Sequence, residues 1–297
     1  MIDFNRITTY PIQERQNKFS VKEMIPLDRQ VESDCEDQIA AIARAMVEAK
    51  KKSAKILFML GGAVVKVGCS ELLIDLMKRG FIDHLAVNGA VSIHDFEVAM
   101  IGETSEDVER GLEDGTFGMV EETGRLLNEA INRGYQDGIG YGLAVGKQIK
   151  ALDLPHKEVS LFYNALELGI PISVHVAVGG DIIHQHPSCN GAALGETSFR
   201  DFKLLSESVA GLSEGMLLNF GSAVNLPEAF LKALTIVRNL KIDVRQFGTA
   251  NFDFLNMYRP RTRLLEWPKK LGCKAYDIRA NHNVSLPLLR QHILKML

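Results

Sequence analysis

Short, uninterrupted apolar runs alternate with helical patterns along most of this chain. A strand that is buried on both faces is apolar throughout, as in parallel sheets. Alternation of such strands with helices indicates βαβ units. We therefore predict an α/β fold with an open, mostly parallel sheet and helices on both faces. The predicted strands span residues 56–60, 84–87, 172–178, 216–219, 244–248 and 276–279. The predicted helices span residues 71–78, 95–100, 120–132, 143–152, 158–168, 199–209, 227–240 and 286–296.

Residues 1–53 lack this alternation, and they predict an N-terminal arm that ends in one helix. Asp34 is a residue type that caps helices, and the basic residues 50–52 suit a last turn. The apolar face of this helix consists of Ile39, Ile42, Met46 and Val47. No repeat or long linker interrupts residues 54–297, so we predict a single domain there.

Charge, hydropathy and cysteine usage exclude several classes of protein. The chain has 34 Lys and Arg against 37 Asp and Glu, and a net charge of −3 argues against a nucleic-acid-binding protein. The longest uncharged apolar run, residues 56–65, is far shorter than the roughly twenty residues of a membrane span, so we expect no membrane partner. The four cysteines form no CxxC motif, so we expect a cytoplasmic protein with reduced thiols.

Glycine or a small polar residue follows nearly every predicted strand. The segments are Leu60-Gly61-Gly62-Ala63, Val87-Asn88-Gly89-Ala90, Val178-Gly179-Gly180-Asp181, Phe220-Gly221-Ser222-Ala223, Phe247-Gly248-Thr249-Ala250-Asn251 and Ala280-Asn281-His282-Asn283. The carboxyl ends of parallel strands share one edge, where ligands bind. One such glycine is ordinary in a turn, but the repeated pattern predicts a nucleotide or dinucleotide across this edge. Neither GxGxxG nor GxxxxGK[ST] occurs, which argues against an ordinary dehydrogenase and a P-loop NTPase.

Three groups of ionisable residues have both a functional and a structural interpretation. One interpretation of His184 and His186 is that they are metal ligands; the other is that they form part of a polar site wall or are packed histidines. No second cluster of ligand residues accompanies them, so we predict no metal. His94 and Glu97 lie in the segment 92–97, which either caps a helix or places an imidazole and a carboxylate in a cleft. Lys269, two residues after the single tryptophan, lies in a solvated turn or is a desolvated, nucleophilic lysine.

Taken in order, the segments of this chain resemble the deoxyhypusine synthase family, and more closely its bacterial deoxyhypusine-synthase-like branch. The resemblance covers roughly residues 50–297. The segments that carry it are Ile56–Val67, Asn88-Gly89-Ala90, His94-Asp95, Ser160–Tyr163, Ile170-Pro171, Asp181, Gly221-Ser222-Ala223-Val224, Thr249-Ala250, Arg259-Pro260, Trp267-x-Lys269, Ala280-Asn281 and Leu286-Pro287-Leu288-Leu289.

The resemblance implies a Rossmann-like fold and a homotetramer with active sites shared between subunits. It also implies NAD, which oxidises a polyamine such as spermidine to an imine. An enzyme lysine, here Lys269 or its neighbour Lys270, takes the aminobutyl group and passes it to an acceptor amine. The NAD contacts of the family correspond to Gly61, Gly62, Ala63, Asn88, Gly89, Asp181, Gly221, Ser222, Thr249, Ala250, Asn281 and His282. The corresponding substrate-binding positions are Trp267, His94, Glu97, His186 and Glu228.

The chain departs from the family where the family has carboxylates. His94 and His186 stand near two acidic positions of the substrate pocket, and Leu226-Pro227-Glu228 replaces a histidine. A pocket for a triply charged polyamine needs carboxylates, so their loss disfavours spermidine and a protein acceptor. Transfer to a small amine fits better. Two alternatives stay open: an NAD-dependent deaminase of the ornithine cyclodeaminase type, and a nucleotide-binding homologue without catalysis.

Overall fold

The structure is a computed structural model of the chain, and it describes residues 3–297. Its centre is a six-stranded sheet in the order β5-β3-β2-β6-β7-β8, and each neighbouring pair is parallel. The strands are β2 (Ile56–Leu60), β3 (His84–Asn88), β5 (Ile172–His175), β6 (Met216–Phe220), β7 (Gly248–Phe252) and β8 (Lys274–Ile278). This confirms the predicted α/β fold with a mostly parallel sheet.

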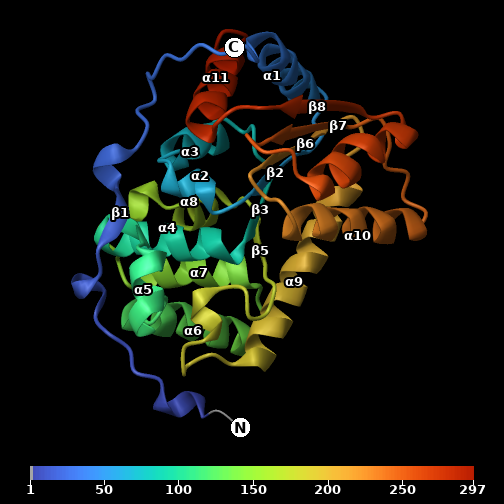
Figure 1. Cartoon of the computed structure of the whole chain (residues 1–297). Helices are drawn as coiled ribbons and strands as arrows, with labels where there is room; N and C mark the ends of the chain where they lie inside the picture. Colours follow the sequence, from blue (N-terminus) through green and yellow to red (C-terminus); the bar gives the residue numbers. More distant parts are fainter. Residues whose placement is uncertain (1–2) are drawn as a thin grey trace.

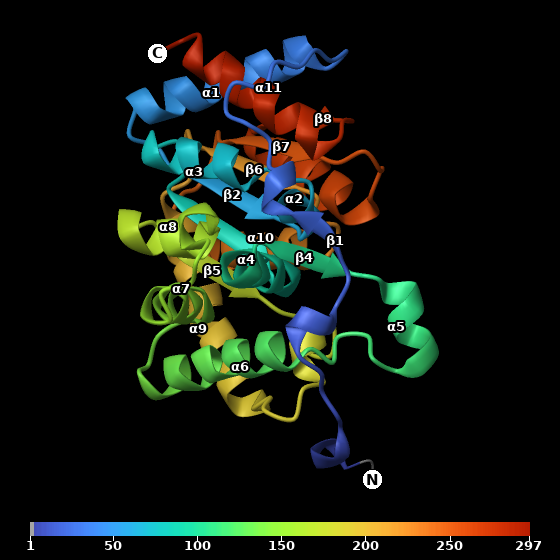
Figure 2. The same ribbon diagram turned by 90° about the vertical axis from the view of Figure 1, so that its left-hand side faces the viewer.

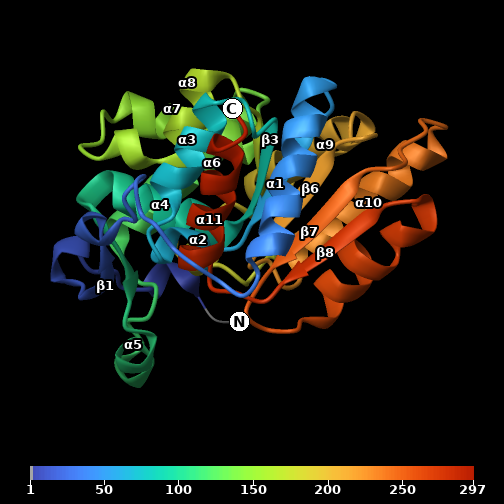
Figure 3. The ribbon, with the colours of Figure 1, turned by 90° about the horizontal axis from the view of Figure 1, so that it is seen from above.

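Helices cover both faces of the sheet (Figure 3). One face carries α1 (Glu36–Lys51), α2 (Ala63–Lys66), α3 (Ser70–Lys78), α4 (Gly89–Ile101), α8 (Leu161–Leu168) and α11 (His282–Leu294). The other face carries α9 (Gly191–Ala210) and α10 (Asn225–Asn239). The helices α6 (Glu121–Gln136) and α7 (Tyr141–Ala151) lie at the β5 edge of the sheet, where both contact α9. Alternate residues of β2 face the two layers: Phe58 and Leu60 belong to the first core, Leu57 and Met59 to the second. Burial on both sides explains why β2 is apolar throughout.

The N-terminal arm is mostly extended, and it runs along the outside of the first helical layer (Figures 1 and 2). It contains the 3-10 turns η1 (Phe4–Arg6), η2 (Ile12–Glu14) and η3 (Val21–Glu23) and the strand β1 (Asn17–Ser20). β1 pairs antiparallel with β4 (Glu103–Glu106), which precedes the short helix α5 (Val108–Asp114). Ile12 and Phe19 are buried, so the arm is packed onto the body rather than free.

Several predicted boundaries are wrong. β7 begins at Gly248, where the sequence-based strand ends, because Val244 and Phe247 are buried in the second core before the strand starts. β5 ends at His175, three residues before the predicted end. α1 begins at Glu36, and no side chain caps it, so Asp34 is not its cap.

The segment with His94 and Glu97 was also misplaced. α4 begins at Gly89, so both residues lie in the middle of the helix and not in its first turn. Asn88, at the end of β3, is the capping residue, and its side chain accepts a hydrogen bond from the Val91 amide. The helix is buried on nearly all sides, so its apolar residues do not mark a single face, and the period by which helices are recognised in a sequence is hidden.

Within residues 3–297, we find no helix with the length and apolar character that a membrane crossing requires.

Candidate functional site

The strand order contains a reversal at the centre of the sheet. From β2 the chain adds β3 and then β5 on one side, and afterwards β6, β7 and β8 on the other. In open α/β sheets a crevice forms at such a reversal, at the carboxyl ends of the strands, and ligands bind there. The reversal lies between β2 and β6, which are followed by Gly61 and Gly221.

Glycine is required at this crevice for steric reasons. A Cβ on Gly61 would lie 2.3 Å from the carbonyl oxygen of Gly221, and the Gly61 amide donates to the Phe220 carbonyl over 2.8 Å. Gly221 has a φ of +67°, and a Cβ there would lie 2.5 Å from Nε2 of His282. The backbones of β2 and β6 therefore meet at the crevice with no side chain between them, which exposes peptide groups to a ligand.

The residues around the crevice fit a phosphate-bearing ligand such as a dinucleotide. α10 and α11 begin at this edge. No side chain caps the first amide groups of α11, and in α10 the Leu226 amide donates to Ser222 Oγ over 3.4 Å. The imidazole of His282, the first residue of α11, is buried, and its Nδ1 lacks a hydrogen-bond partner within the described chain. Of the predicted cofactor residues, Gly61, Gly62, Gly221, Asn281 and His282 lie along this edge.

Asn88, Gly89 and Asp181 lie at the neighbouring end of β3. A Cβ on Gly89 would lie 2.0 Å from Oδ2 of Asp181, so the carboxylate sits directly against the backbone at the start of α4. Burial raises the pKa of Asp181 to about 6. A carboxylate with such a pKa exchanges protons near neutral pH, as a general base does.

A cavity of about 190 Å³ opens beside Asp181, between α4, the arm and the loop after β5. It is lined by Arg15, Lys66, Ala90, Ile93, His94, Glu97, Ser105, Glu106, Val108, Phe117, Gly180, Asp181 and Ile182. His94 is almost fully enclosed here, and burial lowers its pKa to about 4, so the ring is neutral at pH 7.

The tautomer of His94 follows from its neighbours. Thr104 Oγ1 donates its proton to Glu97 over 2.5 Å, so it must accept from Nδ1 of His94 over 2.8 Å. The Nδ1–H tautomer leaves Nε2 of His94 with a free lone pair. His94 and Asp181 are therefore two proton acceptors on the wall of one cavity.

Glu97 lines the same cavity, but its carboxylate is already engaged. It accepts hydrogen bonds from Thr104 and Thr123 and forms a 2.8 Å ion pair with Arg15 of the arm. Glu97 thus holds the arm in place, and its predicted direct role in substrate binding stays a prediction.

Thr249 and Ala250 do not lie at the carboxyl edge of the sheet. They are the second and third residues of β7 and are buried, and Thr249 Oγ1 donates to the Leu264 carbonyl over 2.6 Å. The prediction that they end a strand is wrong because the strand starts four residues later than its apolar signal. Asp253 is the residue that follows β7 at the edge.

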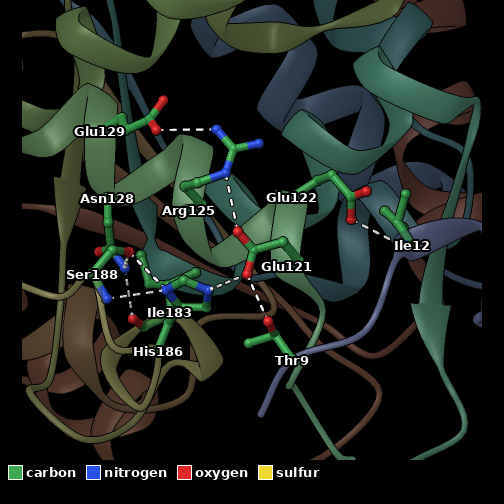
Figure 4. A network of polar contacts seen from close by, with 10 residues as sticks. All are labelled: Thr9, Ile12, Glu121, Glu122, Arg125, Asn128, Glu129, Ile183, His186 and Ser188. Atoms are coloured by element: carbon green, nitrogen blue, oxygen red, sulfur yellow. Dashed lines mark hydrogen bonds and ion pairs between the residues drawn. The ribbon is translucent and has the colours of Figure 1, made fainter. Parts of the chain in front are cut away.

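His186 belongs to a separate polar network (Figure 4). Its Nε2 lies 3.2 Å from Glu121 of α6 and its Nδ1 lies 2.7 Å from Ser188, while Glu121 also accepts from Thr9 of the arm. Both ring nitrogens are occupied, so the interpretation as a packed histidine holds. His184 accepts the amides of Gly179 and Asp181 on its Nδ1. Across residues 3–297, no three His, Cys, Asp or Glu side chains are grouped as metal ligands.

Glu228, Trp267 and Lys269 lie on the other side of the sheet from this cavity. Glu228 in α10 pairs with Arg263 of the π-helix η6 (Pro260–Glu266) over 3.0 Å, and the Arg263 guanidinium stacks 4.4 Å above the Trp267 ring. Lys269 is exposed in η7 (Pro268–Leu271), just before the first residue of β8. Within one chain, Lys269 is therefore beside the amino end of the sheet, opposite the glycine-lined edge.

Sequence reasoning missed the two cations of the cavity, Arg15 and Lys66, and the carboxylate of Glu106. Arg15 lies in an arm without periodic pattern, and nothing local predicts that this arm folds across α4. Lys66 follows the glycines Gly61 and Gly62 by one helical turn, which is a signal that could have been used.

The fold and this edge define a doubly wound α/β protein with a crevice of the dinucleotide-binding kind. Residues 40–145 match the family model described as arginine dihydrolase ArgZ-like, C-terminal, Rossmann fold. The chain is 29% identical over 106 residues to an ornithine cyclodeaminase of Methanothermobacter thermautotrophicus, a match that covers 35% of this chain and 26% of that protein. It is 34% identical over 89 residues to the ornithine cyclodeaminase of Archaeoglobus fulgidus, covering 30% of this chain and 22% of that protein. The matches thus span about a quarter of the length of these relatives.

Solved structures share the fold. The complex of AgrE with ornithine and NAD⁺ superimposes with a TM-score of 0.58 and 15% identity, covering 90% of this chain and 34% of that one. A conserved protein of Methanococcus maripaludis S2, provisionally assigned as LOR/SDH, superimposes with a TM-score of 0.55 and 17% identity. The match covers 92% of this chain and 74% of that one. A protein of Entamoeba histolytica, provisionally assigned as a deoxyhypusine synthase, superimposes with a TM-score of 0.53 and 10% identity. The match covers 89% of this chain and 90% of that one. The predicted relation to the deoxyhypusine synthases is thus supported at the level of the fold, and membership of that family stays a prediction.

Proposed function

We propose that the protein is an NAD-dependent enzyme that oxidises the carbon–nitrogen bond of an amine substrate. The observation that carries this proposal is the reversal of strand order between β2 and β6, where Gly61 and Gly221 bring two backbones together at the crevice. The matched relatives are ornithine cyclodeaminases, and AgrE, which has the same fold, binds ornithine and NAD⁺.

NAD⁺, when bound along the glycine-lined edge, supplies a hydride acceptor. The residues of this chain would do the remaining work at the substrate. An ammonium group must lose a proton before its carbon can give up hydride, because only the neutral amine can form a C=N bond. Asp181 or Nε2 of His94 would accept that proton, the C–H electron pair would leave as hydride, and the product would be an imine. Addition of water to the imine then releases ammonia.

We favour this deaminase-type outcome over aminobutyl transfer because of where Lys269 lies. A strand of five residues spans roughly 16 Å, and Lys269 lies at the amino end of β8 while the crevice lies at the carboxyl end of the sheet. Covalent transfer would need Lys269 from a second copy of the chain, as in the homotetramer that the resemblance implies.

The test is incubation of the protein with NAD⁺ and a panel of diamines, polyamines and basic amino acids. We expect fluorescence of enzyme-bound NADH and one ammonia per NADH with at least one amine. Binding of NAD⁺ without NADH from any amine would instead support the nucleotide-binding homologue without catalysis.

The variant Lys269→Ala separates deamination from transfer. Lys269 is exposed, so its removal should leave the free energy of unfolding within about 0.5 kcal/mol of the parent. We expect turnover and ammonia release to persist. Loss of turnover, together with loss of a borohydride-trapped amine adduct at this position, would favour transfer instead. Lys270→Ala is the control for the neighbouring lysine.

A further inference from the structure

We propose that Arg15 of the N-terminal arm, together with Lys66, binds a carboxylate of the substrate, so that the cavity beside Asp181 selects an amino acid over the corresponding diamine. This inference rests on the proposed function. It adds the arm to the site and gives two residues, neither recognised from the sequence, a role in specificity.

The guanidinium of Arg15 has one free donor group in a buried position. Its side chain is 4% exposed, Nε donates to Asn17 Oδ1 over 2.8 Å, and Nη1 donates to Glu97 over 2.8 Å. Nη2 is buried and has no hydrogen-bond partner in the part of the chain that the structure describes. Buried N–H groups are nearly always paired, and Arg15 lines the cavity, so its unpaired nitrogen calls for a ligand there. A carboxylate is the group that guanidinium geometry fits best.

The charge of Arg15 is only partly used by Glu97. Thr104 and Thr123 also donate hydrogen bonds to Glu97, which shares its negative charge among three donors. Lys66, the last residue of α2, adds a second cation, and it makes no ion pair with any described residue within 4 Å. Arg15, Lys66 and His94 line the same cavity. Burial is the main reason that the pKa of His94 is low; Glu97 raises it, and the two cations lower it further.

Carboxylates also line the cavity. Glu106 lies opposite Asn17 in the β1–β4 pair, two residues from Arg15, and Asp181 lies against Gly89 at the start of α4. Burial raises the pKa of both carboxyl groups. A substrate that carries both an ammonium group and a carboxylate therefore meets groups of both charges in this cavity. A diamine or polyamine would instead place an ammonium group beside Arg15 and Lys66, and an unpaired buried charge is costly.

The volume of the cavity agrees with a small substrate. About 190 Å³ equals the share of roughly six water molecules in the liquid, at about 30 Å³ each. This suits a short amino acid, whereas typical pockets for drug-sized ligands have about 300–1,000 Å³.

The experiment compares ligand pairs that differ only in the carboxylate: ornithine with putrescine, and lysine with cadaverine. Calorimetric titration of the protein in the presence of NAD⁺ measures binding, and NADH formation measures turnover. We expect the protein to prefer the amino acid of at least one pair by tenfold or more. In Arg15→Gln and in Lys66→Gln the affinity for the amino acid should fall at least tenfold, while that for the diamine stays the same or rises.

Two controls keep the test sharp. Arg6→Gln removes an exposed arginine from the same arm and should change nothing. Arg15→Gln leaves Glu97 buried without its cation, so the double variant Arg15→Gln/Glu97→Gln, whose neutral side chains still pair, tests the loss of charge in a folded protein. Lys66 is exposed, and its variant carries no such risk.

Equal affinity for amino acid and diamine in the parent protein would overturn the inference. The inference would also be overturned if the affinities for the amino acid and for the diamine fell equally in folded Arg15→Gln/Glu97→Gln and in Lys66→Gln. Failure of the proposed function looks different: no NAD⁺ binding, or no NADH from any amine, whatever the preference among ligands.

Discussion

Replacement of Gly61 by alanine tests the crevice between β2 and β6. The added Cβ would lie 2.3 Å from the Gly221 carbonyl oxygen and 2.7 Å from its carbonyl carbon. Ordinary contacts of a Cβ start near 3.4 Å, so the two strand ends must separate by about 1 Å. Both obstructing atoms belong to the backbone, so no side chain can rotate away to relieve the overlap.

Overpacking of this kind costs about 1–3 kcal/mol. For a domain of this size each kcal/mol lowers the melting temperature by about 2–4 °C, so we expect a loss of roughly 2–12 °C. The peptide groups that meet at the crevice move as well. We therefore expect the dissociation constant for NAD⁺ to rise at least tenfold, which corresponds to about 1.4 kcal/mol.

The measurements are thermal unfolding and fluorescence titration with NADH. Gly191→Ala is the matched control: Gly191 is the first residue of α9, and a Cβ there meets nothing within 4 Å. It should be neutral or stabilising by up to about 1 kcal/mol. The reasoning fails if Gly61→Ala and Gly191→Ala have the same melting temperature and bind the dinucleotide as well as the parent does.

Two further predictions concern buried polar groups. The pKa of an Asp in the unfolded chain is near 3.9, whereas burial raises the pKa of Asp181 to about 6 in the folded protein. Ionisation of Asp181 therefore lowers the free energy of unfolding as the pH rises from about 4 to 6, and above that range the loss is complete. In urea unfolding at pH 8, the free energy of unfolding of Asp181→Asn should exceed that of the parent by about 1–3 kcal/mol, and at pH 5 the difference should be smaller. Amine oxidation should be lost in this variant. An equal difference at both pH values contradicts the assignment. Ser173 Oγ lies between two buried histidines, 2.7 Å from Nε2 of His84 and 2.9 Å from Nε2 of His175. Ser173→Ala should therefore lower the free energy of unfolding by about 1–3 kcal/mol. The control Ser206→Ala, at a less buried serine, should lower it by at most about 0.5 kcal/mol.

The sheet was predictable because burial on both faces leaves its mark on consecutive residues. β2 is apolar along its whole length and β3 is apolar from Leu85 to Val87, and the glycines that follow them fall where the sequence predicts them. β7 was misplaced because Thr249 and Asn251 are polar yet buried, while the apolar signal of Val244 and Phe247 comes from a loop in the second core. Local hydropathy reports burial, and burial coincides with a strand only where the chain is extended.

The cofactor edge was more predictable than the substrate cavity. Gly61 and Gly221 obey a local rule, since a glycine directly after a strand is visible in the sequence itself. The positions of these side chains depend on contacts between distant segments. Arg15 of the cavity and Glu97 are 82 residues apart, and in the separate network Glu121 and His186 are 65 residues apart. No local pattern encodes such pairs, and for that reason His186 was expected at the site and Arg15 was not.

The sequence and the structure nevertheless converge on the charge of the substrate. By the resemblance to the deoxyhypusine synthases, His94 and His186 stand near positions where that family's polyamine pocket has carboxylates. The structure adds that the cavity around His94 contains two cations, and that burial keeps the ring itself neutral. A loss of carboxylates alone weakens the case for a polyamine, but it does not say what replaces it. Arg15 and Lys66 supply that missing step. A cavity lined by these two cations and by Asp181 offers partners to a molecule that carries both charges, and this favours oxidation of an amino acid over transfer of an aminobutyl group.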